Sequence, residues 1–152
     1  MKREIKFRGK SVDDKNWAYG TYQMINNNTN NPIGNHIVDK HFICSYVSGD
    51  WNLGGWDNVE IDIDSLCQFT GMKDKNGIEI YEGDIIKEHG MNGIIEFLYG
   101  AFNVNWSYGE CYNCYTLLGN YLMRNNDDER NDNILKRIEV IGNIYDNPEL
   151  LK

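Results

Sequence analysis

The cysteines of this chain are the residues best suited to hold a metal or to do redox chemistry. Cys111 and Cys114 form one C-x-x-C pair, and His41 with Cys44 could supply the other half of a zinc site. A redox pair would need a helix N-terminus to stabilise its thiolate, whereas this pair lies in an aromatic, strand-like stretch. We favour a third interpretation, in which the thiols are reduced and pack as small apolar side chains. All three interpretations remain open at this point.

Two groups of carboxylates are spaced closely enough to suggest a metal site or an acid–base pair. A hard cation needs oxygen ligands that converge on one point. Alternate residues of a strand instead share one solvated face, and Asp is a common turn residue. We therefore expect these carboxylates to solvate a strand face and a turn. They are Glu60, Asp62 and Asp64 in the first group and Glu79, Glu82 and Asp84 in the second.

No motif of a known catalytic class accompanies these residues. The sequence contains no phosphate-binding loop, no dinucleotide fingerprint and no Ser, His and Asp in the order of a hydrolase. Its three histidines, His36, His41 and His89, fall in loops or at the ends of expected strands. The sequence therefore predicts a protein that is not an enzyme and has no cofactor or catalytic metal.

The composition predicts one folded, acidic domain. With 152 residues, 41% of them hydrophobic, the chain can bury a core, and we expect residues 1–152 to form a single domain. The formal net charge of -8 argues against direct binding to nucleic acid, which requires basic groups on phosphates. No apolar run is long enough to cross a bilayer, and the first residues lack the apolar part of a secretory signal. We expect a cytoplasmic protein that does not bind membranes.

Segment 68–86 carries the strongest structural signals of the chain. Asn76 and Gly77 predict a two-residue type I′ hairpin turn, because both residues tolerate a positive φ. Gly83 and Asp84 predict a second turn that leads into the next strand. The isoleucines around both turns favour strands.

Short strand-like segments separated by turns fill most of the remaining chain, and no segment has a sustained helical period. This pattern predicts an all-β barrel or sandwich. Asn147, Pro148 and Glu149 predict the start of a short terminal helix. We expect a mobile Asn-rich loop at about 26–32, a Gly- and Trp-rich loop at 49–57 and a charged loop at about 124–133. The expected strands are 3–9, 17–22, 42–47, 59–64, 93–99, 101–106, a pair within 111–122, and 138–145.

Aromatic residues are the best candidates for contact with a partner. We expect Trp51 and Trp56 to fold back on the core, because large aromatic side chains are rarely left in water. If they are exposed, they join Tyr99 and Trp106 as candidate contact residues. Exposed aromatics and open strand edges also predict self-association into a homo-oligomer.

Three motifs resemble the YopX family of phage and prophage proteins. They are REIKFRGK at 3–10 with WAYG at 17–20, the QFTG, DKNG and IYEGDI segments within 68–85, and VIGNIYDNPELL at 140–151. The motifs occur in the family's order and bracket nearly the whole chain. The resemblance implies a mainly β fold, a small Src-homology-3-like partly open barrel with extra strands or hairpins and a short C-terminal helix. It also implies a phage or prophage gene in a bacterial host, and it supplies no catalytic residue.

These features favour a non-enzymatic phage or prophage accessory protein of unknown molecular function. Its expected role is that of a protein-interaction module for an unknown host or phage protein. A first alternative is an acidic decoy that mimics DNA and binds a host DNA-binding protein, based on the net charge and the acidic clusters at 60–64 and 127–129. A metal-dependent enzyme that uses the strand and turn carboxylates is the least favoured alternative.

Overall fold

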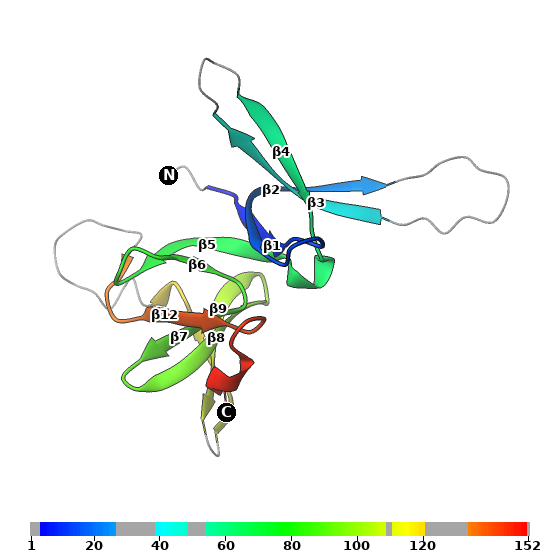
Figure 1. The fold of residues 1–152 in the computed structure, drawn as a ribbon. Helices are drawn as coiled ribbons and strands as arrows, with labels where there is room; N and C mark the ends of the chain where they lie inside the picture. The colour runs from blue at the N-terminus through cyan, green and yellow to red at the C-terminus, as the bar shows by residue number, and fades with distance from the viewer. Residues whose placement is uncertain (1–3, 27–38, 49–53, 109–110, 121–133, 152) are drawn as a thin grey trace, which may run out of the picture. The chain divides into compact units, whose positions relative to one another are not determined.

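Strands form nearly all of the regular structure, so the mainly β class expected from the sequence is confirmed (Figure 1). The computed structural model describes residues 4–26, 39–48, 54–108, 111–120 and 134–151. The elements are β1 (Phe7–Lys10), β2 (Trp17–Asn26), β3 (Asp39–Val47), β4 (Gly55–Glu60), the 3-10 turn η2 (Ile63–Ser65), β5 (Cys67–Asp74), β6 (Glu79–Tyr81), β7 (Asp84–Glu88), β8 (Met91–Leu98), β9 (Ala101–Tyr108), β10 (Cys111–Leu117), β11 (Ile134–Leu135), β12 (Glu139–Asn143) and the 3-10 turn η3 (Pro148–Leu151).

The chain divides into two compact units. Unit 2 comprises Ile5–Gln68, and unit 1 comprises Phe69–Lys152 together with Met1–Glu4. The division falls within β5, which begins in unit 2 and continues into unit 1. The loops expected at about 26–32 and 124–133 fall almost entirely outside the described residues. That residues 1–152 form a single domain stays a prediction.

Unit 2 is an antiparallel sheet in the order β5-β1-β2-β3-β4. At one end, the bridge between Ser11 and Ile61 and a bond from Val12 N to Glu60 O (3.0 Å) link β4 back to β1. No ladder between described residues extends this link, and neither sheet closes into a barrel within the described part of the chain. The described strands therefore form open sheets, and the Src-homology-3-like partly open barrel that the resemblance implies is not confirmed. The reason lies in the chain after Glu60, which turns into η2 instead of continuing alongside β1.

One face of the unit 2 sheet forms its core. Ile43 and Ile61 are buried on this face, at 1% and 3% exposure. The Phe7 and Tyr22 rings meet there with centroids 5.9 Å apart. Gly9 lies under Ile61, where an added Cβ would come within 2.5 Å of Ile61 Cδ1. This close packing fixes which side chains remain on the opposite face, since successive residues of a strand alternate.

Unit 1 contains a five-stranded antiparallel sheet in the order β10-β9-β8-β7-β12. Two-residue turns join β7 to β8 and β8 to β9, with positive φ at His89 (49°) and Gly90 (86°) and at Tyr99 (54°) and Gly100 (79°). Positive φ at both positions is the type I′ geometry, which matches the right-handed twist of the flanking strands. The strands expected at 93–99 and 101–106 are thus confirmed, and they pair as a hairpin. The unit 1 core comprises Ile80, Ile86, Ile95, Val104, Trp106, Leu118 and Ile138.

The hairpin expected at Asn76 and Gly77 is present between β5 and β6, but its predicted turn type is wrong. Gly77 has φ 81°, whereas Asn76 is not among the residues with positive φ. Gly77 N donates to Asp74 O (3.0 Å), and Asp74 N donates to Ile78 O (2.8 Å). These bonds define a three-residue loop with a glycine bulge. The Asp74 carboxylate accepts from Asn76 N at 2.8 Å and so stabilises this longer loop.

The expected terminal helix is not confirmed, because residues Pro148–Leu151 form a single 3-10 turn and no α-helix. Leu150 N donates to Asn147 O (3.1 Å), the three-residue spacing of that geometry. Four residues are too few to offset the entropy of nucleating an α-helix.

Candidate interaction surface

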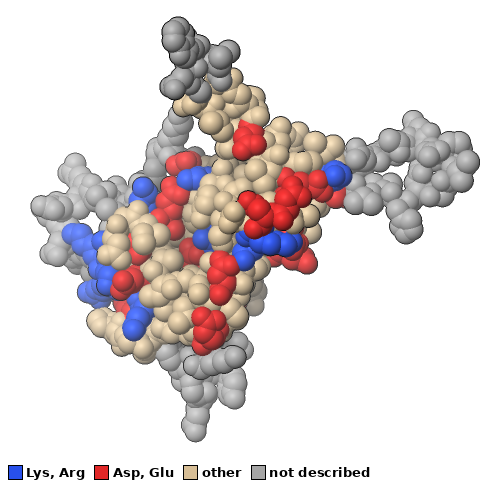
Figure 2. All heavy atoms as spheres, in the orientation of Figure 1, with Lys and Arg blue, Asp and Glu red and all other residues tan. Residues whose placement is uncertain are grey.

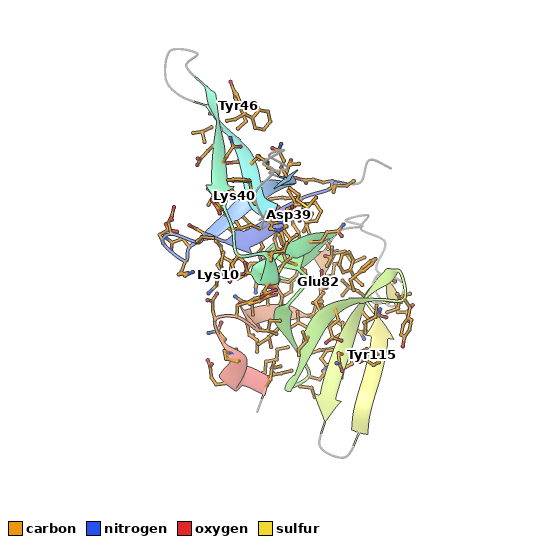
Figure 3. The ribbon with its side chains drawn as sticks, turned by 90° about the vertical axis from the view of Figure 1, so that its right-hand side faces the viewer. Lys10, Asp39, Lys40, Tyr46, Glu82 and Tyr115 are labelled. Atoms are coloured by element: carbon orange, nitrogen blue, oxygen red, sulfur yellow. The ribbon has the colours of Figure 1, made fainter. Side chains whose placement is uncertain are left out.

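Strands β3 and β4 of unit 2 carry two exposed aromatic side chains beside each other. Tyr46 pairs directly with Trp56 across the ladder, so both project from the same face. Their ring centroids are 5.7 Å apart, with an angle of 73° between the planes. Tyr46 is 61% exposed and Trp56 is 68% exposed. Figure 3 shows Tyr46 projecting from the β3–β4 ribbon.

The expectation that Trp56 folds back on the core is therefore wrong. The loop expected at 49–57 ends earlier, because β4 already begins at Gly55. Strand alternation then directs Trp56 to the face opposite Ile43 and Val59, which pair with each other toward the core. Trp51, the other tryptophan of that segment, lies outside the described residues.

The face that carries Tyr46 and Trp56 continues along both strands to an ion pair. Lys40 Nζ lies 2.7 Å from Glu60 Oε2 at its far end. Between these ends, Cys44 is buried and its thiol donates to Gln23 Oε1 at 3.4 Å. The exposed aromatic side chains thus lie at one end of a face whose other end carries the ion pair and the half-buried Phe42. We call the following set the aromatic face: Lys40, Phe42, Cys44 and Tyr46 of β3, with Trp56, Asn58 and Glu60 of β4.

The remaining candidate contact residues lie in unit 1. Tyr99 is fully exposed in the turn between β8 and β9. Trp106 is only 5% exposed and belongs to the unit 1 core, where its indole lies over Gly93. Its burial leaves almost no surface for a partner, so the structure contradicts its use as an exposed contact. Sequence reasoning missed Tyr46, because the run of Phe42–Val47 lacks the alternation that separates a buried from an exposed face.

The strand expected at 59–64 is shorter than predicted, and its three carboxylates do not share a face. β4 ends at Glu60, and Asp62 becomes the N-cap of η2, where its Oδ1 accepts from Asp64 N at 3.2 Å. Glu60 is held by Lys40. These contacts give each of the two carboxylates Glu60 and Asp62 a local structural role.

The carboxylates of the central segment also have structural partners. Asp84 is buried and its Oδ2 accepts from Tyr81 N at 2.7 Å, which confirms the expected turn role. Glu79 Oε2 accepts from the Tyr81 hydroxyl at 2.8 Å. Asp74, which sequence reasoning missed, is completely buried and accepts from Ile78 N (2.9 Å) and from Val140 N (3.0 Å) as well as from Asn76. A buried carboxylate that accepts three backbone N–H groups stabilises the fold and is not available to bind a substrate.

The proposed His41 and Cys44 half of a zinc site is not assembled. The two residues lie three positions apart on β3, so they project to opposite faces. His41 Nδ1 is 2.7 Å from the Tyr22 hydroxyl. Cys44 and Cys67 are buried and form no disulfide, as expected for cysteines that pack as small side chains in the interior. The described residues contain no group of three or more His, Cys, Asp or Glu able to hold a metal, and the side chains of Cys111 and Cys114 lie outside them.

Charge is mixed on the surface drawn in Figure 2, where Lys and Arg atoms are interspersed with Asp and Glu atoms. Hydrogen bonds from Ser11 and then Asn16 lower the pKa of Asp14, which is exposed on the turn after β1. In unit 1, the hydrogen bond and charge of Lys75 lower the pKa of Glu139. Neither carboxyl lies on the aromatic face.

The fold and this surface define a small all-β protein with an exposed aromatic pair. Comparison with known families identifies it further: a family model described as "YopX protein" matches residues 6–152, so the chain belongs to the YopX family. No curated protein matches the chain. Among solved structures, the crystal structure of protein EF1440 from Enterococcus faecalis is 24% identical, covers 99% of this chain and 100% of its own, and has a TM-score of 0.49. No helix in the described residues is long and apolar enough to span a membrane.

Proposed function

We propose that this YopX-family chain is a non-enzymatic protein-interaction module, encoded by a phage or prophage and acting in the bacterial cytoplasm on another protein. The observation that supports the proposal is the exposed Tyr46–Trp56 pair. Burying such side chains against a partner would remove much apolar area from water, and Trp and Tyr are the residues that dominate the energetics of interfaces.

The pair is also held in place before any partner binds. Trp56 meets Tyr46 edge to face, and the Tyr46 hydroxyl lies over Gly54, where an added Cβ would clash with that oxygen. Aromatic side chains with few free torsions and a fixed neighbour lose little entropy on binding. An exposed and preorganised aromatic pair is therefore suited to the centre of a binding surface.

The two alternatives receive less support from the same residues. A decoy of DNA needs carboxylates spaced like phosphates, but Glu60 is neutralised by Lys40 and Asp74 and Asp84 are buried. An enzyme needs polar groups that converge on an open site, whereas Glu60, Glu79 and Asp84 bond to their own backbone or to neighbouring side chains.

Affinity capture from lysates of the lysogenic or infected host tests the proposal. The bait proteins are wild type, Trp56→Ala and the control Tyr115→Ala, which truncates a 44% exposed tyrosine on β10 in unit 1 (Figure 3). We expect wild type and the control to retain the same protein. Trp56→Ala should weaken that binding by about 2 kcal/mol, or roughly 30-fold, as for an interface hot spot.

Two results would contradict the proposal. One is capture of the same proteins at the same level by Trp56→Ala. The other is metal-dependent turnover of phosphodiester or peptide substrates by the purified protein, since that would identify an enzyme. Thermal unfolding of each bait confirms that the comparison is made between folded proteins.

A further inference from the structure

We propose that β4 is a docking edge that accepts an extended, basic segment of another protein as an additional strand. This inference rests on the proposed function and specifies the chemistry of the partner. It depends on three features of unit 2: an open strand edge, the direction of its backbone groups, and the charge along it.

The edge is open from Gly55 to Val59, because β4 is the last strand of its sheet in the described part of the chain and only Glu60, at its end, has a bond on the outer side, from Val12 N. Among the described residues it pairs only with β3, in the register from Phe42 with Glu60 to Val47 with Gly55. Residues Gly55–Asn58 are exposed. Natural proteins usually protect such an edge with a covering element, a proline or an inward-pointing charge, since a free edge recruits other strands.

The backbone direction of β4 follows from two hydrogen bonds at its end. Ile61 N donates to His41 O of β3 (2.9 Å), so the backbone of Ile61 points toward β3. Glu60 O accepts from Val12 N (3.0 Å), so the backbone of Glu60 points away from β3. Because N–H and C=O groups alternate direction along a strand, Asn58 and Trp56 also point outward.

Outward backbone groups at Trp56 and Asn58 can therefore form a ladder with an incoming strand. The same residues direct their side chains to the aromatic face, so a side chain of the incoming strand would pack beside Trp56 and Tyr46. Backbone bonds would supply affinity, and the aromatic pair would select an apolar residue at one position, as in other cases of strand addition.

The charge along this edge favours a basic partner. Residues 55–66 contain four carboxylates, at Asp57, Glu60, Asp62 and Asp64, and no Lys or Arg. Lys40 of β3 pairs with Glu60, so these four carboxylates and the one ammonium together carry a net charge of -3. Opposite charges on facing strands stabilise a ladder, and like charges destabilise it. A second copy of this chain would bring two segments of the same negative charge together along β4. Charge complementarity thus selects a Lys- or Arg-containing segment over a second copy.

Asn58→Pro tests the ladder directly. Proline removes the outward N–H of Asn58 without removing a bond to β3, and prolines are tolerated at such edge positions. Asn58→Ala is the matched control, because it shortens the same side chain and keeps the N–H. The probe is an immobilised array of seven-residue peptides composed of Lys, Arg, Glu, Thr, Val and Tyr, with thermal unfolding to verify each variant.

We expect wild type and Asn58→Ala to bind peptides enriched in Lys or Arg over Glu, and Asn58→Pro to bind them at least about tenfold more weakly. Equal binding by Asn58→Pro, no preference for Lys or Arg, or no binding at all would overturn the inference. A dimer of wild type that Asn58→Pro abolishes in light scattering would also overturn it, by making a second copy the occupant. If Asn58→Pro still captures the host protein that Trp56→Ala loses, the strand addition fails while the proposed function stands.

Discussion

Replacing Asp74 with Asn should destabilise unit 1 although the side chain keeps its size. The carboxylate is completely buried and accepts three backbone N–H groups, from Asn76, Ile78 and Val140. It thereby connects the β5–β6 turn to β12, which lies 66 positions away in the sequence. An amide has one acceptor oxygen and one donor nitrogen, so it cannot satisfy all three donors.

The expected magnitude follows from the best orientation left to the amide. Its oxygen can keep the bonds from Asn76 and Ile78, and its nitrogen then faces the Val140 N–H at about 3 Å. The bond from Val140 to a charged acceptor, about 1.5–3 kcal/mol, is lost, and the two remaining bonds lose their charge. We expect a total loss of about 3 kcal/mol in the free energy of unfolding.

Urea unfolding followed by circular dichroism measures this loss as a lower midpoint at an unchanged slope. Hydrogen exchange gives a local measure, since the Val140 amide should lose protection in the variant. The exposed Asp57 provides the control, and Asp57→Asn should change stability by less than about 0.5 kcal/mol. A loss below about 1 kcal/mol with the Val140 amide still protected would refute the assigned role of Asp74.

Three further predictions concern packing, turn geometry and pH. Gly93→Ala should lower the free energy of unfolding by about 1–3 kcal/mol through overpacking, because the new Cβ would lie 2.6 Å from Trp106 Cε3 and 2.7 Å from Val104 Cγ1. The control in thermal unfolding is Gly55→Ala, whose Cβ would have no atom within 4 Å. Tyr99→Asn should keep or raise the melting temperature, because Tyr99 is fully exposed at φ 54° and Asn tolerates that conformation better. A lower melting temperature would contradict the type I′ geometry assigned to the turn. The pKa of Glu139 is lower in the folded chain than in the unfolded chain, because Lys75 stabilises its charged form. The pair therefore stabilises the fold at pH values above the unfolded-state pKa, and this stabilisation is lost as pH falls through the folded-state pKa. Carboxyl NMR titration should show the Glu139 midpoint rising toward its ordinary value in Lys75→Met, and an unchanged midpoint would count against the ion pair.

Local signals in the sequence predicted strands and turns better than they predicted how the strands are arranged into sheets. The turns at Gly83 and at Gly100 were correct, because positive φ at glycine is a local requirement. The loop at Gly77 was one residue longer than predicted, since the side chain of Asp74 bonds to that loop's own backbone. The strand expected at 59–64 ended at Glu60, because Asp62 caps a 3-10 turn that alternation of residue types does not reveal.

At the candidate surface, too, residue types were easier to predict than their exposure, which depends on the tertiary structure. Trp56 was recognised as a possible contact, but its exposure depended on where β4 begins. Tyr46 was not recognised, because its exposure arises from pairing with Trp56 across the ladder. Trp106 has the same residue type as Trp56, yet it is buried because Gly93 leaves room for its ring.

The sequence by itself determined the β class, the principal turns and the YopX-family membership, since these depend on residue types at short spacing. Only the tertiary structure decided that the sheets stay open, that Asp74 anchors β12, and that Tyr46 and Trp56 meet on one exposed face. The physical reason is that strand register and sheet edges are set by contacts between residues far apart in the chain. Such contacts select one face for each side chain, and alternation alone cannot indicate which face is buried.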